Sequence, residues 1–304
     1  MATMTKADIT LSALPPAAGR AGLRGVLASE FTKLRSVRST YWTIGALLVV
    51  SIGLAAAISA GTAADMNSHP GDKAGFDATQ VSLGAFFYLG QLIIAVLGAM
   101  AITSEYSTGM IRTSLTAMPR RGTVFLSKLL VFTGVALVIS VVTSFLAFFV
   151  GQAVLSGSGV SASLFHSTTV PMAARETPQA TTLLGSFTVT PGAVLTAIIG
   201  IALFVTAAAV IAFGLGAIIR HTAGAIASAI GLLFVLPIII QLLPSNWRWD
   251  LVRFFPDAAG QVLSTTVGPH NVHMWSAWPQ FAVTAIWAAV LVGIGAYLFR
   301  KRDA

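Results

Sequence analysis

The stretch TSEYSTGMIRTSLTAMPRRGTVFLSK, residues 103–128, is a polar and basic interruption between two long apolar runs. The runs cover residues 81–102 and 129–150, and neither contains a charged residue. Each is long enough to cross the roughly 30 Å hydrocarbon core of a bilayer as a helix. The stretch is therefore predicted to form a short loop at a membrane surface, with a membrane span on either side.

A helical pattern occupies the middle of this stretch. Between residues 108 and 118, apolar residues recur at helical spacing and polar or basic residues fall on the other flank: Met110, Ile111, Leu115 and Met118 against Arg112, Thr113 and Thr116. Ser107 or Thr108 is suited to cap the start of such a helix, and Pro119 to end it. A short amphipathic helix held at the membrane face is a natural surface for docking another protein.

The composition of the whole chain is that of a membrane protein. Of 304 residues, 56% are hydrophobic and only 9% are charged, whereas a soluble domain carries roughly 25% charged residues. The formal charge of +8 does not indicate nucleic acid binding, because the basic residues follow membrane topology rather than one continuous face. The chain contains no cysteine, which excludes disulfides, thiolate metal sites and cysteine nucleophiles.

The chain begins with a predicted disordered cytoplasmic tail, residues 1–21, followed by a surface helix over residues 22–38. Apolar residues of this helix fall on one stripe and basic residues flank it: Leu23, Val26, Leu27, Leu34 and Val37 against Arg24, Lys33 and Arg35. Glu30 lies inside the apolar stripe. Two interpretations are open for its carboxylate: it pairs with an arginine of residues 112–121, or it reaches water at the membrane interface.

The apolar runs predict an all-α integral membrane protein, in which residues 22–304 form one six-span domain. The predicted spans cover residues 41–60, 81–102, 129–150, 191–219, 222–243 and 277–299. Pro237 predicts a kink in the fifth span. Residues 151–190 are expected to form a loop that holds a short helix, and residues 244–276 a re-entrant or interfacial hairpin broken at Pro256.

The distribution of basic residues predicts the orientation. Of the 18 Lys and Arg residues, 14 fall on one side of the predicted membrane, namely before the first span, in residues 103–128, at Arg220 and at the C-terminus. Cytoplasmic loops carry the excess of Lys and Arg, so both termini and the central stretch are predicted to be cytoplasmic.

We find no pattern of a catalytic, cofactor or metal site in the sequence. His270 and His273 are spaced for a shared metal, but no further ligand stands beside them. The predicted spans contain no ionisable residue, which argues against an ion-coupled transporter. The sequence lacks GxxxxGK[ST], so we expect no nucleotide-binding loop in this chain, and any energy from ATP must come through a partner.

Three segments in this order resemble the permease subunits of export-type ATP-binding cassette (ABC) transporters, the ABC-2 class common in bacteria. They are SEFTKLRSVRSTYW at 29–42, TSEYSTGMIRTSLTAMPRR at 103–121 and IIRHTAGAIA at 218–227. The resemblance implies that residues 22–38 are an elbow helix on the cytoplasmic leaflet, with Glu30, Lys33 and Arg35 as its charged residues. It also implies that residues 105–118 form a coupling helix that docks on the ATPase.

The resemblance further implies which residues and partners take part. The coupling residues are expected to be Glu105, Tyr106, Arg112, Arg120 and Arg121. Glu105 and Arg112 are expected on one side of a continuous helix, paired with each other or with the elbow. Arg120 and Arg121 either contact the ATPase or anionic lipid, or are ordinary positive-inside charge.

The expected partners are a cytoplasmic ABC ATPase, a second copy of the permease as a homodimer, and membrane lipid, with no nucleic acid. The expected location is the bacterial cell membrane, and the expected cargo is a hydrophobic or amphipathic molecule moved outward. The alternative is a membrane scaffold or assembly factor that does not transport and uses the same cytoplasmic helix for docking.

Overall fold

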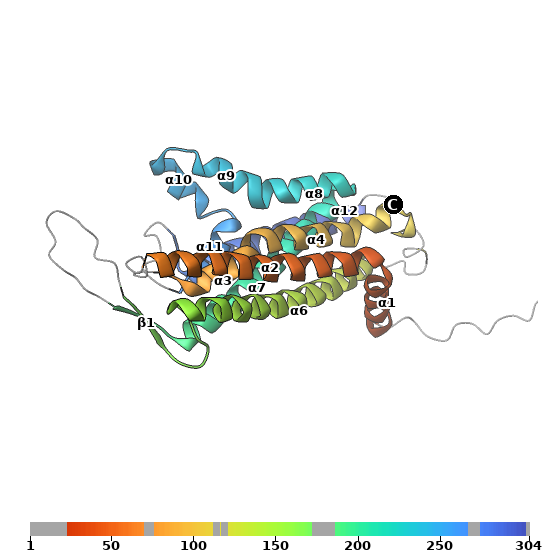
Figure 1. Cartoon of the computed structure of the whole chain (residues 1–304). Coiled ribbons are helices and arrows are strands. Elements are labelled where there is room, and N and C mark those ends of the chain that lie inside the picture. Colours follow the sequence, from red (N-terminus) through yellow and green to blue (C-terminus); the bar gives the residue numbers. More distant parts are fainter. Residues whose placement is uncertain are drawn as a thin grey trace, which may run out of the picture.

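The computed structural model describes residues 23–69, 76–111, 116, 121–171, 186–266 and 274–301, which form a bundle of helices with one small β ribbon (Figure 1). Six helical segments in this part of the chain are long and apolar enough to cross a membrane: Arg38–Ser68, Ala78–Ser107, Arg121–Ser158, Pro191–Ile219, Thr222–Gln241 and Ala277–Lys301. The predicted six-span, all-α fold is therefore confirmed. Several spans extend beyond the predicted apolar runs.

The helices, in chain order, are α1 (Leu23–Ser36), α2 (Arg38–Ser68), α3 (Ala78–Ala85), α4 (Gln91–Ser107), α6 (Arg121–Leu155), α7 (Pro191–Ile219), α8 (Thr222–Ile230), α9 (Leu236–Gln241), α10 (Ser245–Val252), α11 (Asp257–Leu263) and α12 (Ala277–Lys301). Two π-helical turns, η2 (Phe86–Gly90) and η4 (Gly231–Val235), join α3 to α4 and α8 to α9. The second and fifth spans are therefore continuous helices, each with one wide turn.

Figure 1 places α1 and the C-terminal end of α12 at one end of the bundle, and strand β1 and helix α10 at the other. We call these the α1 end and the β end. The ribbon at the β end pairs β1 (Thr168–Pro171) antiparallel with β2 (Ser186–Val189), with Thr168 opposite Val189. Residues 151–190 were expected to hold a short helix; the described part contains this ribbon and a 3₁₀ turn, Ser156–Ser158.

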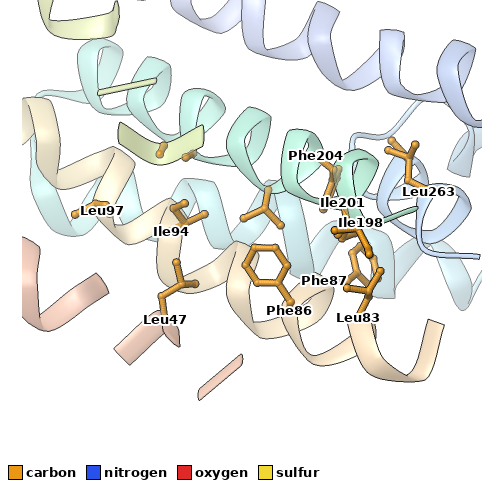
Figure 2. Close-up of a cluster of buried hydrophobic side chains, with 14 of the residues drawn as sticks. Leu47, Leu83, Phe86, Phe87, Ile94, Leu97, Ile198, Ile201, Phe204 and Leu263 are labelled. Carbon is orange, nitrogen blue, oxygen red and sulfur yellow. The ribbon is translucent and has the colours of Figure 1, made fainter. Parts of the chain in front are cut away.

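Helix α7 lies at the centre of the bundle. In its most apolar window 72% of the residues are buried, and it packs along α4, α6 and α12. Figure 2 shows Ile198, Ile201 and Phe204 of α7 against Phe86 and Phe87 of the second span. Gly98 of α4 faces the backbone carbonyl of Ala209 so closely that a Cβ atom there would have no room. The small residue lets the two helices approach, as is typical of helix pairs in membranes.

The other spans are peripheral. Only 17–28% of the most apolar windows of α2, α6, α8–α9 and α12 is buried within the chain. Large apolar side chains such as Trp42, Val49 and Ile286 are exposed on them. A single copy of the chain therefore presents broad apolar faces, as expected for helices that meet lipid or another membrane subunit.

Helices α10 and α11 form the hairpin predicted to break at Pro256. Its turn is held by side chains of α12: Thr284 Oγ1 donates to the Pro256 carbonyl at 2.9 Å, and Trp287 Nε1 donates to the Phe254 carbonyl at 2.9 Å. At 1.5 Å per residue, Trp287 lies about 15 Å from the first residue of α12. The hairpin thus extends about 15 Å along α12, whose side chains bond carbonyls that an apolar environment would leave unbonded.

Pro237 was predicted to kink the fifth span. The structure places the π-helical turn η4 directly before the short helix α9, in which Pro237 occupies the first turn. Proline has no N–H to donate and its ring crowds the preceding turn, so the wide turn relieves both problems. The irregularity was therefore predicted at the correct place.

Candidate functional site

Helix α1 lies across the end of the bundle and contacts α6 and α2. Its inner face carries Val26 and Glu30, one helical turn apart, which are 5% and 3% exposed. Arg35 is exposed on α1. Of the predicted apolar stripe, Val26 is buried, Leu27 and Leu34 are half-buried, and Val37 is exposed. The amphipathic pattern therefore predicted the inner face of α1 only in part.

Four charged side chains from α1, α4 and α6 meet at this end of the bundle. We call Glu30, Lys33, Glu105 and Lys128 the charge cluster. The Lys128 ammonium lies 2.7 Å from Oε2 of Glu30 and 2.7 Å from Oε1 of Glu105. The Lys33 ammonium lies 2.6 Å from Oε1 of Glu30 and 3.4 Å from Oε1 of Glu105. Each ammonium therefore contacts both carboxylates, and the four formal charges sum to zero.

Most of the charge cluster is removed from water. Glu30, Glu105 and Lys128 are each less than 10% exposed, whereas the Lys33 side chain is 29% exposed. Burial acts to raise the pKa of Glu30, but the charge of Lys128 and hydrogen bonds from Lys128 and Lys33 outweigh it, so this pKa lies below its ordinary value of 4.5. Burial acts to lower the pKa of Lys33, but its hydrogen bond to Glu30 and the charge of Glu105 outweigh it and hold this pKa above 10.5.

The partner of Glu30 differs from the predicted one. An arginine of residues 112–121 was one of the two expectations, and exposure to water the other; Lys33 and Lys128 take this position instead. Lys128 was missed as a site residue because it stands at the start of an apolar run, where a lysine is ordinary at a membrane surface. Lys128 could have been suspected from Glu30, because a carboxylate within the apolar stripe of α1 needs a buried cation as its partner.

The two spans bring Glu105 and Lys128 together by continuing as helices past their apolar runs. Helix α4 runs to Ser107 and α6 starts at Arg121, so much of the 103–128 stretch is helical rather than loop. Glu105 lies half a turn from the end of α4, and Lys128 lies two turns into α6. The two residues meet at this end although the helices pack mainly against others, α4 against α7 and α6 against α2 and α7.

The predicted start of the amphipathic helix is wrong. Ser107 is the last residue of α4, and the Thr108 hydroxyl donates to the Ser104 carbonyl, so both residues end a helix instead of starting one. Gly109 follows with a φ of +70°, a left-handed conformation that glycine adopts readily. The helix that contains Glu105 therefore ends before residue 112, whereas a continuous helix from Glu105 to Arg112 had been expected.

Of the remaining predicted coupling residues, Arg121 is half-buried at the first position of α6. Arg112 and Arg120 lie outside the described residues, as do six of the fourteen residues of the predicted coupling helix, 112–115, 117 and 118. Met110, Ile111 and Thr116 are helical. Ile111 is 3% exposed, so the chain just beyond the Gly109 break packs against the bundle.

Tyr106 connects the same end of α4 to the other half of the bundle. The guanidinium of Arg220 lies 5.0 Å from the centroid of the Tyr106 ring, and it donates to the Leu298 carbonyl of α12 at 3.3 Å. Next to it, the Thr222 hydroxyl lies 3.0 Å from that of Thr103. Glu105 thus contacts α1 and α6, while Tyr106 contacts the α7–α8 turn.

From the sequence, Arg220 entered the count of basic residues and the segment 218–227, but no role in the site was predicted for it. It caps α7 in a left-handed conformation with a φ of 59°, which is uncommon for a residue other than glycine. The contact between Arg220 and Tyr106 could have been suspected from the sequence, because Arg220 is the one arginine in a two-residue turn between two long apolar spans.

Two recesses flank the end of α4. One, of about 260 Å³, opens beside the charge cluster, between α1, α2 and α4, and its lining includes Lys33, Glu105 and Lys128. The other, of about 480 Å³, is lined by Tyr106, Arg220 and His221, among others. This geometry suits a mechanical connection: a displacement of the chain that follows α4 would act on both sides of the bundle through Glu105 and Tyr106.

Comparison with known proteins identifies the family. No curated protein sequence matches the chain. The family model for the ABC-2 family transporter protein matches residues 26–220, well over half of the chain, from α1 to the end of α7. The matched region contains all four residues of the charge cluster. The chain therefore belongs to the ABC-2 family of transporter proteins.

Proposed function

We propose that this chain is the permease subunit of an ABC exporter in the bacterial cell membrane, driven by a separate ATPase subunit. The family match and the six apolar spans support a permease. The excess of Lys and Arg at the α1 end supports a cytoplasmic position for α1, the 103–128 stretch and both termini. A second copy of the permease completes the pathway by a two-fold axis, the commonest symmetry of homo-oligomers.

The observation that carries the mechanism is the charge cluster beside the segment expected to meet the ATPase. Closure of two ATPase subunits on ATP displaces residues 110–120, with Arg120 and Arg121 in contact with the ATPase or with anionic lipid. Because α4 ends only two residues before this segment, the displacement reaches Glu105 and Tyr106 directly. The charge cluster then moves α1 and α6, and Arg220 moves α7 and α12.

The charge cluster suits this task because it is paired internally. The ion pairs Glu30–Lys128 and Glu105–Lys128 link α1, α4 and α6, and one helix can move alone only if several of these short contacts break at once. The three helices are therefore expected to move as one unit. The scaffold alternative also uses a docking surface at this end, but the family match supports transport.

The test is purification of the tagged chain from its native host in mild detergent, followed by identification of the proteins that remain bound. We expect a P-loop ATPase in equal amount, with ATP hydrolysis that depends on the permease. Glu105→Gln is expected to lower this dependent hydrolysis at least tenfold while the chain still inserts in the membrane. Asp65→Asn is the matched control, because Asp65 is an exposed carboxylate near the far end of α2.

Recovery of the chain alone, with no ATPase stimulated by adding it, would contradict the proposal and favour the scaffold. If an ATPase binds and is stimulated equally by wild type and by Glu105→Gln, the permease function would stand, but the proposed role of Glu105 in coupling would be contradicted.

A further inference from the structure

A third recess, of about 260 Å³, lies in the other half of the bundle, between η2, α9, α10 and α11. Its lining combines aromatic and charged side chains, which include Tyr88, Arg248, Trp249, Phe255, Asp257 and Gln261. It is separate from the charge cluster, and it is formed largely by the re-entrant hairpin.

Asp257 is a buried carboxylate without a counter-charge. It is 6% exposed and accepts a hydrogen bond from Gln261 Nε2 at 2.8 Å. Gln91 of α4 faces it, yet both amide atoms of Gln91 are buried without a hydrogen bond of normal geometry. Within the described residues no Lys, Arg or His lies within ion-pair distance of Asp257. In the charge cluster, by contrast, each carboxylate contacts two lysines.

The depth of Asp257 makes this arrangement costly. Gln91, which faces it, lies near the middle of the 30-residue second span, about 20 Å from Ala78 at 1.5 Å per residue. The tip of the hairpin lies at the level of Trp287, midway along α12. A carboxylate buried this far along apolar helices is costly without a counter-charge, and such groups usually line a functional cavity.

Arg248 provides the opposite charge in the same recess without neutralising Asp257. Its guanidinium lies 4.6 Å from the centroid of the Trp249 ring. Its Nε is buried and has no hydrogen-bond partner among the described residues. Two opposite charges therefore line one cavity, each with unused hydrogen-bonding capacity.

We propose that this recess binds a zwitterionic group, with its ammonium against Asp257 and its phosphate or carboxylate against Arg248. Carboxylate with nearby aromatic rings is the usual environment for an ammonium group, and the guanidinium fork suits a phosphate or carboxylate. Ligand pockets for whole drug-sized molecules measure about 300–1,000 Å³, so this recess holds a head group whose apolar remainder extends toward lipid.

The ligand has two possible sources with this one chemistry: the head group of a membrane lipid, or the polar end of an amphipathic transported molecule. The binding itself does not depend on the proposed ATPase partner. It can therefore be measured on the purified permease alone, and the two proposals can fail separately.

The experiment is native mass spectrometry of the purified chain with two short-chain probes, dihexanoyl phosphatidylethanolamine and dihexanoyl phosphatidylglycerol. Both carry a phosphate, but only the first carries an ammonium. We expect at least tenfold tighter binding of the ethanolamine probe, because its ammonium can donate a charge-assisted hydrogen bond to Asp257, which is stronger than a bond from the neutral hydroxyls of the glycerol probe. Asp257→Asn should abolish this preference, and Arg248→Gln should weaken both probes.

The matched control is Asp250→Asn. Asp250 lies on the same hairpin but is exposed and pairs with Arg253, so its loss should leave both affinities unchanged. Asp257→Glu keeps the charge and should keep the preference. If Asp257→Asn does not fold, the proposal is still tested by comparing the affinities of the two probes for the wild-type chain.

Equal affinity of the wild type for the two probes would overturn the proposal, as would an unchanged preference in Asp257→Asn. Where the preference is found, adding the ethanolamine probe to the permease with its ATPase separates the sources. Stimulated ATP hydrolysis assigns the recess to transported molecules, and unchanged hydrolysis assigns it to a resident lipid.

Discussion

The Nζ atom of Lys128 lies 2.7 Å from Oε1 of Glu105, so these two residues join the second and third spans at the membrane end where α1 lies. The same ammonium reaches Glu30 at 2.7 Å, which brings α1 into the same network. Because two carboxylates balance two ammonium groups, removing one side chain leaves a net charge whereas removing one of each sign does not, so the two changes should differ sharply.

Glu105→Gln leaves two lysines with one carboxylate, and Lys128→Met leaves two carboxylates with one lysine. Removing one partner of a buried pair costs about 3–5 kcal/mol, whereas replacing both is often neutral. We therefore expect both single variants to lower the apparent melting temperature in detergent. The double variant, which retains the Glu30–Lys33 pair, should melt close to wild type.

Thermal unfolding followed by intrinsic fluorescence is measured for wild type, the two single variants and the double variant. These four proteins form a double-mutant cycle, which gives the interaction energy between Glu105 and Lys128. Additive losses in the double variant would show that Glu105 and Lys128 act independently, against the geometry described above.

The pKa shift of Glu30 predicts a dependence of stability on pH. Since the folded-state pKa lies below the ordinary value of 4.5, the stabilisation from Glu30 is complete above pH 4.5 and is lost as the pH falls toward the folded pKa. The pKa of Lys33 is raised, so its contribution is complete below pH 10.5 and is lost above it. We expect the difference in melting temperature between wild type and Glu30→Gln to shrink from pH 5 to pH 3.5. A constant difference over this range would contradict the shift.

Gly98 and Gly53 offer a paired test of helix packing. Gly98→Ala places a methyl group against the Ala209 carbonyl, and overpacking of this kind costs about 1–3 kcal/mol. Gly53→Ala on α2 meets nothing within 4 Å, so its better helix propensity should leave stability unchanged or slightly higher. We expect a lower melting temperature for Gly98→Ala than for Gly53→Ala when both are measured in the same detergent. Equal melting temperatures would contradict the close approach of α4 and α7.

The proposed orientation is testable because the chain has no cysteine of its own. Ser167→Cys, exposed at the β end, should react with a membrane-impermeant maleimide in intact cells. Ser36→Cys, exposed on α1, should react only after the cells are permeabilised. The reverse labelling pattern would invert the topology.

The sequence predicted the parts of this protein that depend on runs of one residue class. Six apolar stretches, the amphipathic α1 and the Pro256 break each follow from local composition, and the structure contains all three. Gly109 shows where local composition is insufficient to predict where a helix ends. Apolar spacing on both sides of a glycine resembles one continuous helix, and only the left-handed backbone reveals that α4 has ended.

The charge cluster and the Asp257 recess depend instead on contacts between distant segments. Lys128 looked like an ordinary interfacial lysine, because nothing in its neighbourhood shows that Glu30 of α1 packs against it. Asp257 lay in a segment with mixed polarity, outside the six predicted spans. Its depth follows only from the hydrogen bonds of the hairpin to α12.

The composition of the charge cluster also constrains how the protein is assembled. As the ribosome makes the chain, α1 emerges before the six spans, with Lys33 as the one member of the charge cluster then available to pair with Glu30. Lys128 appears only after two spans have been inserted, and until then the inner face of α1 retains a partly uncompensated carboxylate. The final packing of α1 on the bundle must therefore follow insertion of the third span, so a helix that is synthesised before all six spans reaches its native position after three of them are inserted.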